Sequence, residues 1–356
     1  MSSASPSVAL PQRKHRVSGL WYRLSAACSI IVAIALALIP LTAILVLGWL
    51  MRMMRRETAI ALVRAGDPAM KRRAAKDRLA AIDMFAPLAR FPGWRRGFGD
   101  TVRSGLRATI ALALATLPFG AILLLAWWAG WENSFNKGYE QAWVGPLVSL
   151  IGVFIALFVL IHLPMGLAHH AAERRIGAIW ELRVIRRLIA HVRWRYLALT
   201  LVSIVLAAPL YLAQILPTFI ENINPELATA GPEEIKRFAF LWHLGFTAYL
   251  VVMLVILRRW AARLYARALV RQGLAPGAFA SSTGGFARSI SHALALPEFE
   301  AHQAPGRFGG FVATLLLAAA WFGFIAALYV AQFANHAWWN WLNLPAVALP
   351  WIYRVF

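Results

Sequence analysis

Long apolar stretches alternate with short polar or basic ones along the whole chain. A helix needs about 20 apolar residues to cross the roughly 30 Å hydrocarbon core of a bilayer. Six stretches meet this length, at residues 24–50, 108–128, 143–163, 196–220, 238–257 and 311–333. The pattern predicts an all-α fold, a polytopic transmembrane helix bundle with about six spans and basic amphipathic helices at the membrane surface.

The first stretch, 24–50, differs from the others because both its flanks are basic and Pro40 lies near its middle. A single crossing would leave one cationic flank outside the membrane, and the stretch is too short for two crossings. Either the N-terminal tail is external, or Pro40 bends the stretch into a re-entrant dip. The dip is favoured.

Residues 173–217 combine a basic half with an apolar half. In the basic half an apolar residue recurs every four positions from Ile176 to Val192, and the arginines fall mainly on the opposite face. Those arginines are Arg175, Arg183, Arg186, Arg187 and Arg193. This pattern is typical of a helix that lies in the membrane surface with its cations toward anionic lipid. It predicts a lipid-facing basic helix that then turns and enters the membrane.

The loops between the apolar stretches alternate in charge. Residues 51–107, 169–195 and 258–309 are rich in Lys and Arg, whereas 129–142 and 221–237 carry most of their charge as glutamates. Because cytoplasmic loops collect Lys and Arg, the basic loops should be cytoplasmic. The expected organisation is a polar basic tail (1–23), a first apolar run with a basic cytoplasmic region (24–107), two proline-broken helical hairpins (108–257), a basic cytoplasmic loop (258–309), and a last span with a Trp-rich segment (310–356).

Pro118 and Pro209 each lie near the centre of a predicted span. A proline inside a membrane helix frees a carbonyl that neighbours or water must satisfy, so these residues and Pro40 are candidates for a kink or a gate. In the gate interpretation, hairpins 94–168 and 173–257 form a repeat around a central cavity, as in some transporters. Gln214 and His162 are the candidates for polar groups along such a path.

Charge and composition narrow the class of protein. The net charge is +21 and 60% of the residues are hydrophobic. A soluble protein with this surplus would suggest a nucleic-acid partner. Here the cations lie between apolar stretches, where the positive-inside rule and anionic membrane lipids explain them, so no nucleic-acid binding is expected. The single cysteine, Cys28, excludes a disulfide within the chain.

Three apolar stretches, each interrupted by glycine and proline, are the basis of a resemblance to a known protein family. They are ALIPLTAILVLGWLMRMMRR (37–56), GWRRGFGDTVRSGLRATIALALATLP (93–118) and LPMGLAHHAAERRIGAIWELRVIRRL (163–188), the last followed by RYLALTLVSIVL (195–206). Over about residues 30–220 the chain resembles a family of uncharacterised prokaryotic integral-membrane domains, a domain of unknown function. The resemblance implies a multi-pass protein of a bacterial-type cytoplasmic (inner) membrane and implies no activity.

Candidate chemistry is sparse. No acidic or basic residue lies at the centre of a predicted span, which argues against proton- or sodium-coupled transport. No metalloprotease, phosphate-loop or hydrolase motif is present, so no enzyme activity, cofactor or metal is predicted.

Three functions remain as hypotheses. The first is a non-enzymatic membrane protein that organises anionic lipids or partner proteins through Arg-rich cytoplasmic helices. The second is a transporter or channel for an uncharged or lipid-like solute. The third is a membrane protein with a histidine-bound cofactor, for which His162, His169 and His170 are the candidates.

Overall fold

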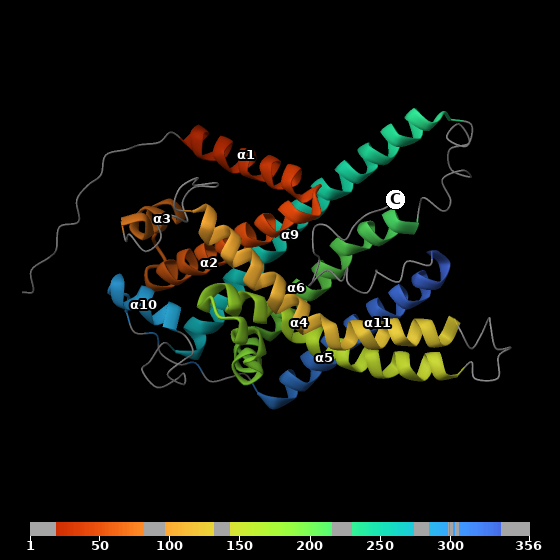
Figure 1. Cartoon of the computed structure of the whole chain (residues 1–356). Helices are drawn as coiled ribbons and strands as arrows, with labels where there is room; N and C mark the ends of the chain where they lie inside the picture. Colours follow the sequence, from red (N-terminus) through yellow and green to blue (C-terminus); the bar gives the residue numbers. More distant parts are fainter. Residues whose placement is uncertain are drawn as a thin grey trace, which may run out of the picture.

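The computed structural model describes residues 19–81, 97–131, 143–215, 230–273, 285–297, 299, 302 and 306–335, and all structural statements concern these residues. They form helices and contain no β-strand. Figure 1 shows α1 (Gly19–Ala37), α2 (Pro40–Gly66), α3 (Arg72–Ala81), α4 (Phe98–Trp131), α5 (Val144–Glu173), the short 3-10 helix η3 (Ile176–Trp180), α6 (Leu182–Ile215), α9 (Pro232–Gln272), α10 (Gly285–Ala293) and α11 (Arg307–Asn335).

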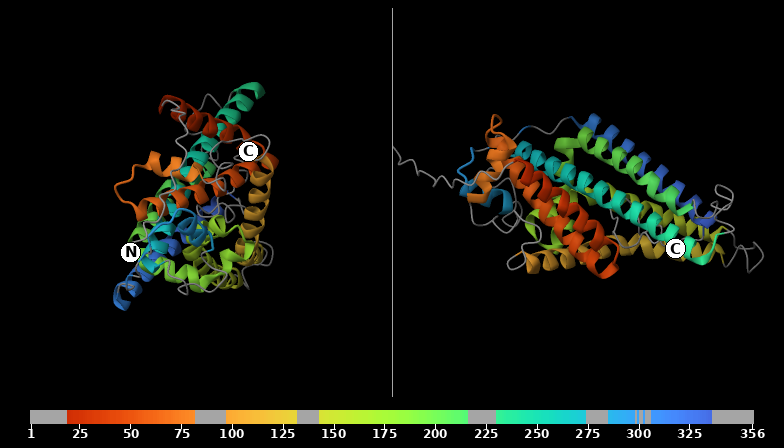
Figure 2. Two further views of the ribbon diagram at one scale, coloured as in Figure 1. Left: turned by 90° about the vertical axis from the view of Figure 1, so that its left-hand side faces the viewer. Right: turned by 90° about the horizontal axis from the view of Figure 1, so that it is seen from above.

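The predicted all-α fold is confirmed, and five of the described helices are long and apolar enough to cross a membrane: α4, α5, α6, α9 and α11. They coincide with the predicted spans from 108–128 onward, except that residues 216–220 of the span 196–220 lie outside the described residues; this architecture fits a multi-pass membrane protein. α4 packs along α5, and α6 packs on α9. α11 lies against α6, so that α9, α6 and α11 run side by side (Figure 2, right).

The first predicted span is two helices rather than one. α1 and α2 meet at Leu38 and Ile39 and form a V, so that α2 runs back toward the end of the bundle from which α1 started (Figure 1). Pro40 is the first residue of α2, and Ile39 before it is extended (φ −111°, ψ 125°), as the residue before a proline prefers. This geometry agrees with a chain that bends back at Pro40 and not with a single straight crossing.

The turn between α1 and α2 satisfies its own backbone. The hydroxyl of Thr42 donates to the carbonyl of Leu36 at 2.6 Å, with Ile39 O also within reach at 3.1 Å. An unpaired carbonyl is costly away from water. Thr42 therefore stabilises a helix break that proline alone would leave unsatisfied.

The long helices extend beyond their apolar stretches at the basic end. α9 has 41 residues, which gives a length of about 60 Å, twice the thickness of the hydrocarbon core. The prediction that a loop begins at residue 258 is wrong, because α9 continues to Gln272. Its last four turns pack through Ala262, Tyr265 and Leu269 into the core formed with α2, and Ala and Arg are strong helix formers.

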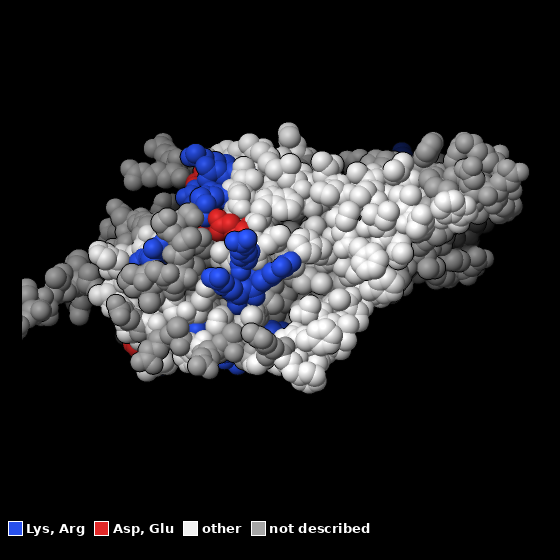
Figure 3. Space-filling model, turned by 90° about the horizontal axis from the view of Figure 1, so that it is seen from below, with Lys and Arg blue, Asp and Glu red and all other residues white. Residues whose placement is uncertain are grey.

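Basic side chains gather at this same end. Figure 3 shows that the Lys and Arg side chains of the lower face gather on one half of it, while almost no charged side chain is seen on the described surface of the other half. Exposed apolar side chains occur on the long helices, as a lipid-facing surface requires, for example Leu117, Phe154, Leu241 and Leu315. Glu233, in the first turn of α9, lies at the end opposite to Arg271, which bonds to the carbonyl of His191 on α6.

Candidate anion-binding site

Two glycines bring α2 and α4 into backbone contact. A Cβ atom added to Gly48 would lie 2.0 Å from the carbonyl oxygen of Thr101, and one added to Gly105 would lie 2.1 Å from that of Ile44. Small residues allow such close crossing of membrane helices. One turn beyond this crossing, α2 presents arginines to the first turns of α4.

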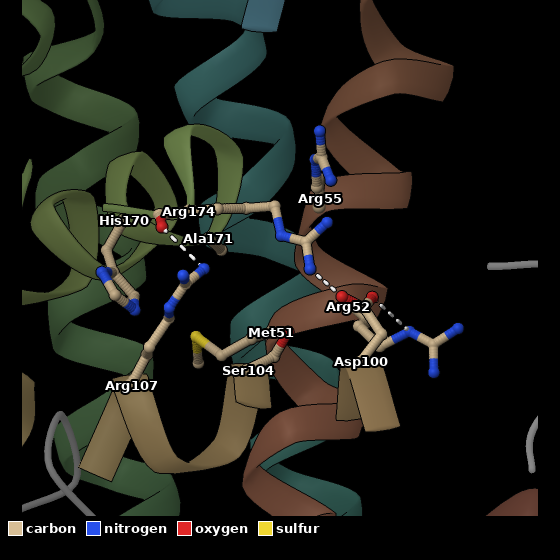
Figure 4. A pocket seen from close by; sticks show the side chains of 9 residues that line it. All are labelled: Met51, Arg52, Arg55, Asp100, Ser104, Arg107, His170, Ala171 and Arg174. Atoms are coloured by element: carbon tan, nitrogen blue, oxygen red, sulfur yellow. Dashed lines mark hydrogen bonds and ion pairs between the residues drawn. The ribbon is translucent and has the colours of Figure 1, made fainter. Parts of the chain in front are cut away.

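A pocket lies beside the crossing (Figure 4). Its cavity volume is about 20 Å³, and it is partly open to solvent. Its walls come from α2, the start of α4, the end of α5 and the residue after α5. The lining residues are Met51, Arg52, Arg55, Asp100, Ser104, Arg107, His170, Ala171 and Arg174. We refer to it below as the arginine pocket.

Charge in the arginine pocket is unbalanced. Four guanidinium groups face one carboxylate, so the formal charge is four minus one, or +3. Asp100 bridges the helices: its Oδ2 lies 3.6 Å from Nε of Arg52, and its Oδ1 pairs with Arg174 (Figure 4). A single carboxylate therefore holds α2, α4 and the end of α5 together and leaves a surplus of positive charge.

Backbone carbonyls fix several of these side chains. Arg52 donates to Gly97 O at 2.5 Å and to the hydroxyl of Thr101. Arg107 donates to the carbonyl of Arg174 at 3.2 Å, where α5 ends in a left-handed residue (φ 59°). The guanidinium of Arg55 lies 4.6 Å from the ring centre of Phe286 on α10, a cation–π contact. The positive groups are thus held in place before any anion arrives.

Burial and mutual repulsion act on the arginines in the same direction. Burial lowers the pKa of Arg55 to about 10, and the positive charge of Arg174 adds to this effect. The same two causes lower the pKa of Arg52, and burial lowers the pKa of Arg174. All three remain protonated at neutral pH. An anion bound in the pocket would offset the unfavourable burial and repulsion of these positive charges, which the lowered pKa values reflect.

The polar groups suit a phosphate. Guanidinium groups bind phosphate oxygens through paired N–H donors. The hydroxyl of Ser104 also lines the pocket and makes no hydrogen bond within the described structure. Basic pockets between membrane helices are typical sites for lipid head groups. The arrangement can bind an anion.

The predicted basic helix is only partly as expected. Residues 176–180 form η3, and the α-helix begins at Leu182, so residues 175–195 are not one continuous helix. Arg175, Arg183, Arg186 and Arg187 are exposed, and Arg175 pairs with Glu181; that this set faces lipid stays a prediction. The backbone of α6 is non-helical at Val192 (φ −130°, ψ 18°), which is where the basic half meets the apolar half.

Arg193 is a correction to the lipid-facing set. It is only 6% exposed, and it donates to the carbonyl of Gly306 at 3.0 Å, just before α11. The break at Val192 changes the face on which the following residues lie, so Arg193 turns into the protein. Gly310 makes room for it, since an added Cβ there would lie 2.9 Å from Nη1 of Arg193.

The prolines proposed as kinks or gates have different surroundings. Pro118 and Pro209 lie inside α4 and α6, which continue through them, and both face outward. Pro40 begins α2, and its side chain lies outside the described structure. The side chain of Gln214 also lies outside the described structure. His162 is near the surface beside Arg186 on α6.

The other two histidines belong to a structural network. His169 bonds to the hydroxyl of Tyr265 through Nδ1 and to Glu181 through Nε2, both at 2.8 Å. Arg175 donates to the second oxygen of Glu181 at 2.6 Å. The bond from His169 is the main cause that lowers the pKa of Glu181. His170 Nδ1 lies 2.8 Å from the carbonyl of Arg175. Among the described residues, no three His, Cys, Asp or Glu side chains form a metal-binding group.

Sequence reasoning missed the arginine pocket. The sequence places its arginines only within two basic loops, 51–107 and 169–195, and His170 among the candidate cofactor ligands. One signal was present: Asp100, Ser104 and Arg107 recur at helical spacing and therefore share a face of α4. The contribution of α2 could not be seen in this way, because it depends on the glycine crossing.

Comparison with protein-family models, with curated proteins and with solved structures found no match. The resemblance to the uncharacterised prokaryotic membrane family therefore remains a prediction, and the function must be argued from the site itself.

Proposed function

We propose that this protein is a non-enzymatic multi-pass membrane protein that binds anionic phospholipid at the basic end of its helix bundle. We further propose that this end faces the cytoplasm of a bacterial-type cell, in its inner membrane. The observation that carries the proposal is the arginine pocket, where four guanidinium groups face one carboxylate. The phosphate group of an anionic lipid would supply the missing negative charge.

The position of the pocket supports a lipid rather than a soluble anion. It lies between α2, the first turns of α4 and the end of α5, next to the apolar part of α4, which is long enough to cross a membrane. A head group at this depth can reach the guanidiniums while its acyl chains remain in the membrane. The surplus of Lys and Arg in the neighbouring loops would attract the same lipids over a longer range.

The test is lipid retention by the full-length protein. The protein would be purified in detergent, mixed with phosphatidylglycerol or phosphatidylcholine, and examined by native mass spectrometry for bound lipid. Arg107→Gln removes one guanidinium whose described bond is to the carbonyl of Arg174. The matched control is Arg103→Gln, one turn earlier on α4, where the arginine is exposed and does not line the pocket.

We expect Arg107→Gln to lower the affinity for phosphatidylglycerol about tenfold, the usual scale of a hydrogen bond to a charged group. The control should retain lipid like the original protein, and retention should weaken as salt rises. Equal retention of both lipids, unchanged by Arg107→Gln and by salt, would contradict the proposal. Inorganic phosphate that competes fully at millimolar concentration would instead identify the ligand as a soluble anion.

A further inference from the structure

A second cavity lies between α4, α5, η3 and the start of α6. It is a small hollow with a cavity volume of about 20 Å³, part of it open to the outside. Its lining residues are Ala115, Phe158, Val159, His162, Leu163, Ile179, Trp180 and Leu182. Apart from His162, the lining side chains are aliphatic or aromatic. The cavity shares no lining residue with the arginine pocket.

Arg186 lies at the rim of this cavity in a fixed position. Its Nε donates to Nε2 of His162 at 3.3 Å, and its guanidinium lies 5.4 Å from the ring centre of Phe158. Nδ1 of His162 is 2.6 Å from the carbonyl of Phe158, which places the ring proton on Nδ1 and leaves Nε2 as the acceptor. The imidazole of His162 therefore accepts a hydrogen bond from one of the three guanidinium nitrogens of Arg186.

The other nitrogens of Arg186 remain available. Within the described structure its two terminal nitrogens have no hydrogen-bond partner, and Arg183 and Arg187 beside it are exposed and make no described contact. Trp180 and Trp194 are 43% and 53% exposed on either side of these arginines. Exposed tryptophans are typical of the membrane–water interface.

We infer that this cavity is a second lipid site, in which one acyl chain of an anionic phospholipid lies against the apolar walls at its open mouth and the lipid phosphate pairs with Arg186. The apolar lining excludes a sugar or a soluble anion, because burying their polar groups without partners is costly. The cations at the rim select a phospholipid over an uncharged hydrocarbon. The site stands apart from the arginine pocket and does not depend on the function proposed for it.

The inference can be tested with a phosphatidylglycerol that carries a photoreactive diazirine on its acyl chain. The full-length protein in nanodiscs is cross-linked, digested and mapped by mass spectrometry. We expect cross-links on residues 158–163 and 179–182. Ala115→Leu fills the cavity from α4, where Ala115 is 2% exposed. Ala113→Leu, on the exposed face of the same helix, is the matched control.

Ala115→Leu should abolish the cavity cross-links, and Arg186→Gln should reduce them about tenfold. Ala113→Leu and Arg107→Gln should leave them unchanged, so failure here is distinguishable from failure of the arginine pocket. If Ala115→Leu does not fold, as judged by thermal unfolding, the effect of Arg186→Gln on the cavity cross-links tests the inference by itself. Cross-links spread evenly over the apolar surface would overturn the inference, as would equal labelling by a diazirine alkane that is insensitive to Arg186→Gln.

Discussion

The crossing of α2 and α4 at Gly48 and Gly105 offers the sharpest test of the fold. In Gly48→Ala the new methyl would lie 2.0 Å from Thr101 O, and in Gly105→Ala it would lie 2.1 Å from Ile44 O. A carbon and an oxygen in contact normally stay about 3.3 Å apart. Each alanine must therefore push two helix backbones apart by about 1.3 Å. No side-chain rotation can relieve the clash, because the atom that is struck belongs to the backbone.

Overpacking of this kind costs about 1–3 kcal/mol, and backbone displacement places these two sites at or above the upper limit. The gain in helix propensity from Gly to Ala returns only about 1 kcal/mol. We expect a net loss of about 2 kcal/mol for each variant, measured as the free energy of unfolding of the full-length protein in mixed detergent.

Gly323→Ala on α11 is the control, because no atom lies within 4 Å of the added methyl. It should unfold at the same free energy as the original protein or a higher one. The double variant Gly48→Ala with Gly105→Ala should cost less than the sum of the two, since one displacement makes room for both methyl groups. Variants at Gly48 and Gly105 that are as stable as Gly323→Ala would refute the close crossing.

Three further predictions concern charge and proline. Glu57, only 4% exposed, pairs with Arg72, Arg259 and Arg263. Glu57→Gln leaves these cations facing one another and should lower the free energy of unfolding by about 2 kcal/mol; an unchanged value would show the cluster to be dispensable. The lowered pKa of Glu181 means that its carboxylate adds stability above the ordinary glutamate pKa of about 4.3, lost as pH falls through the lower folded value. Thermal unfolding of Glu181→Gln should therefore differ from that of the original protein at pH 7 and converge with it toward pH 3. Pro118→Ala should keep or raise the unfolding temperature, because α4 already continues through this exposed residue; a lower temperature would show that the helix needs its proline.

Hydropathy predicts the membrane helices well because a single physical requirement dominates them. A chain segment inside the bilayer must be apolar and must satisfy its own backbone, and the described part of each of the five later stretches coincides with a long helix. The helix break at Pro40 could also be predicted from the sequence, because proline lacks the backbone N–H donor that a continuing helix needs. The turn back at Leu38 and Ile39 follows from that break.

Hydropathy fails where a helix leaves the membrane. The end of α9 is as basic as a loop, and periodicity of charge alone gave no reason to continue the helix past residue 258. Tertiary packing keeps this part of α9 helical, because Tyr265 is fully buried and its hydroxyl contacts His169 on α5. Such long-range contacts cannot be derived from local sequence. For the same reason the arginine pocket could not be predicted, because Arg52 and Arg174 meet only through Asp100.

A count of arginines overstates how many of them are available to lipid. Many donate to backbone carbonyls at or near helix ends and so complete the fold, as Arg52 does at Gly97, Arg193 at Gly306 and Arg271 at His191. Arg183 and Arg187, by contrast, are exposed and make no described contact. The two groups should respond differently to salt, because buried pairs are screened far less than exposed charges. Rising ionic strength should therefore release bound anionic lipid well before it lowers the unfolding temperature, and a parallel loss of both would mean that the same arginines serve lipid and fold.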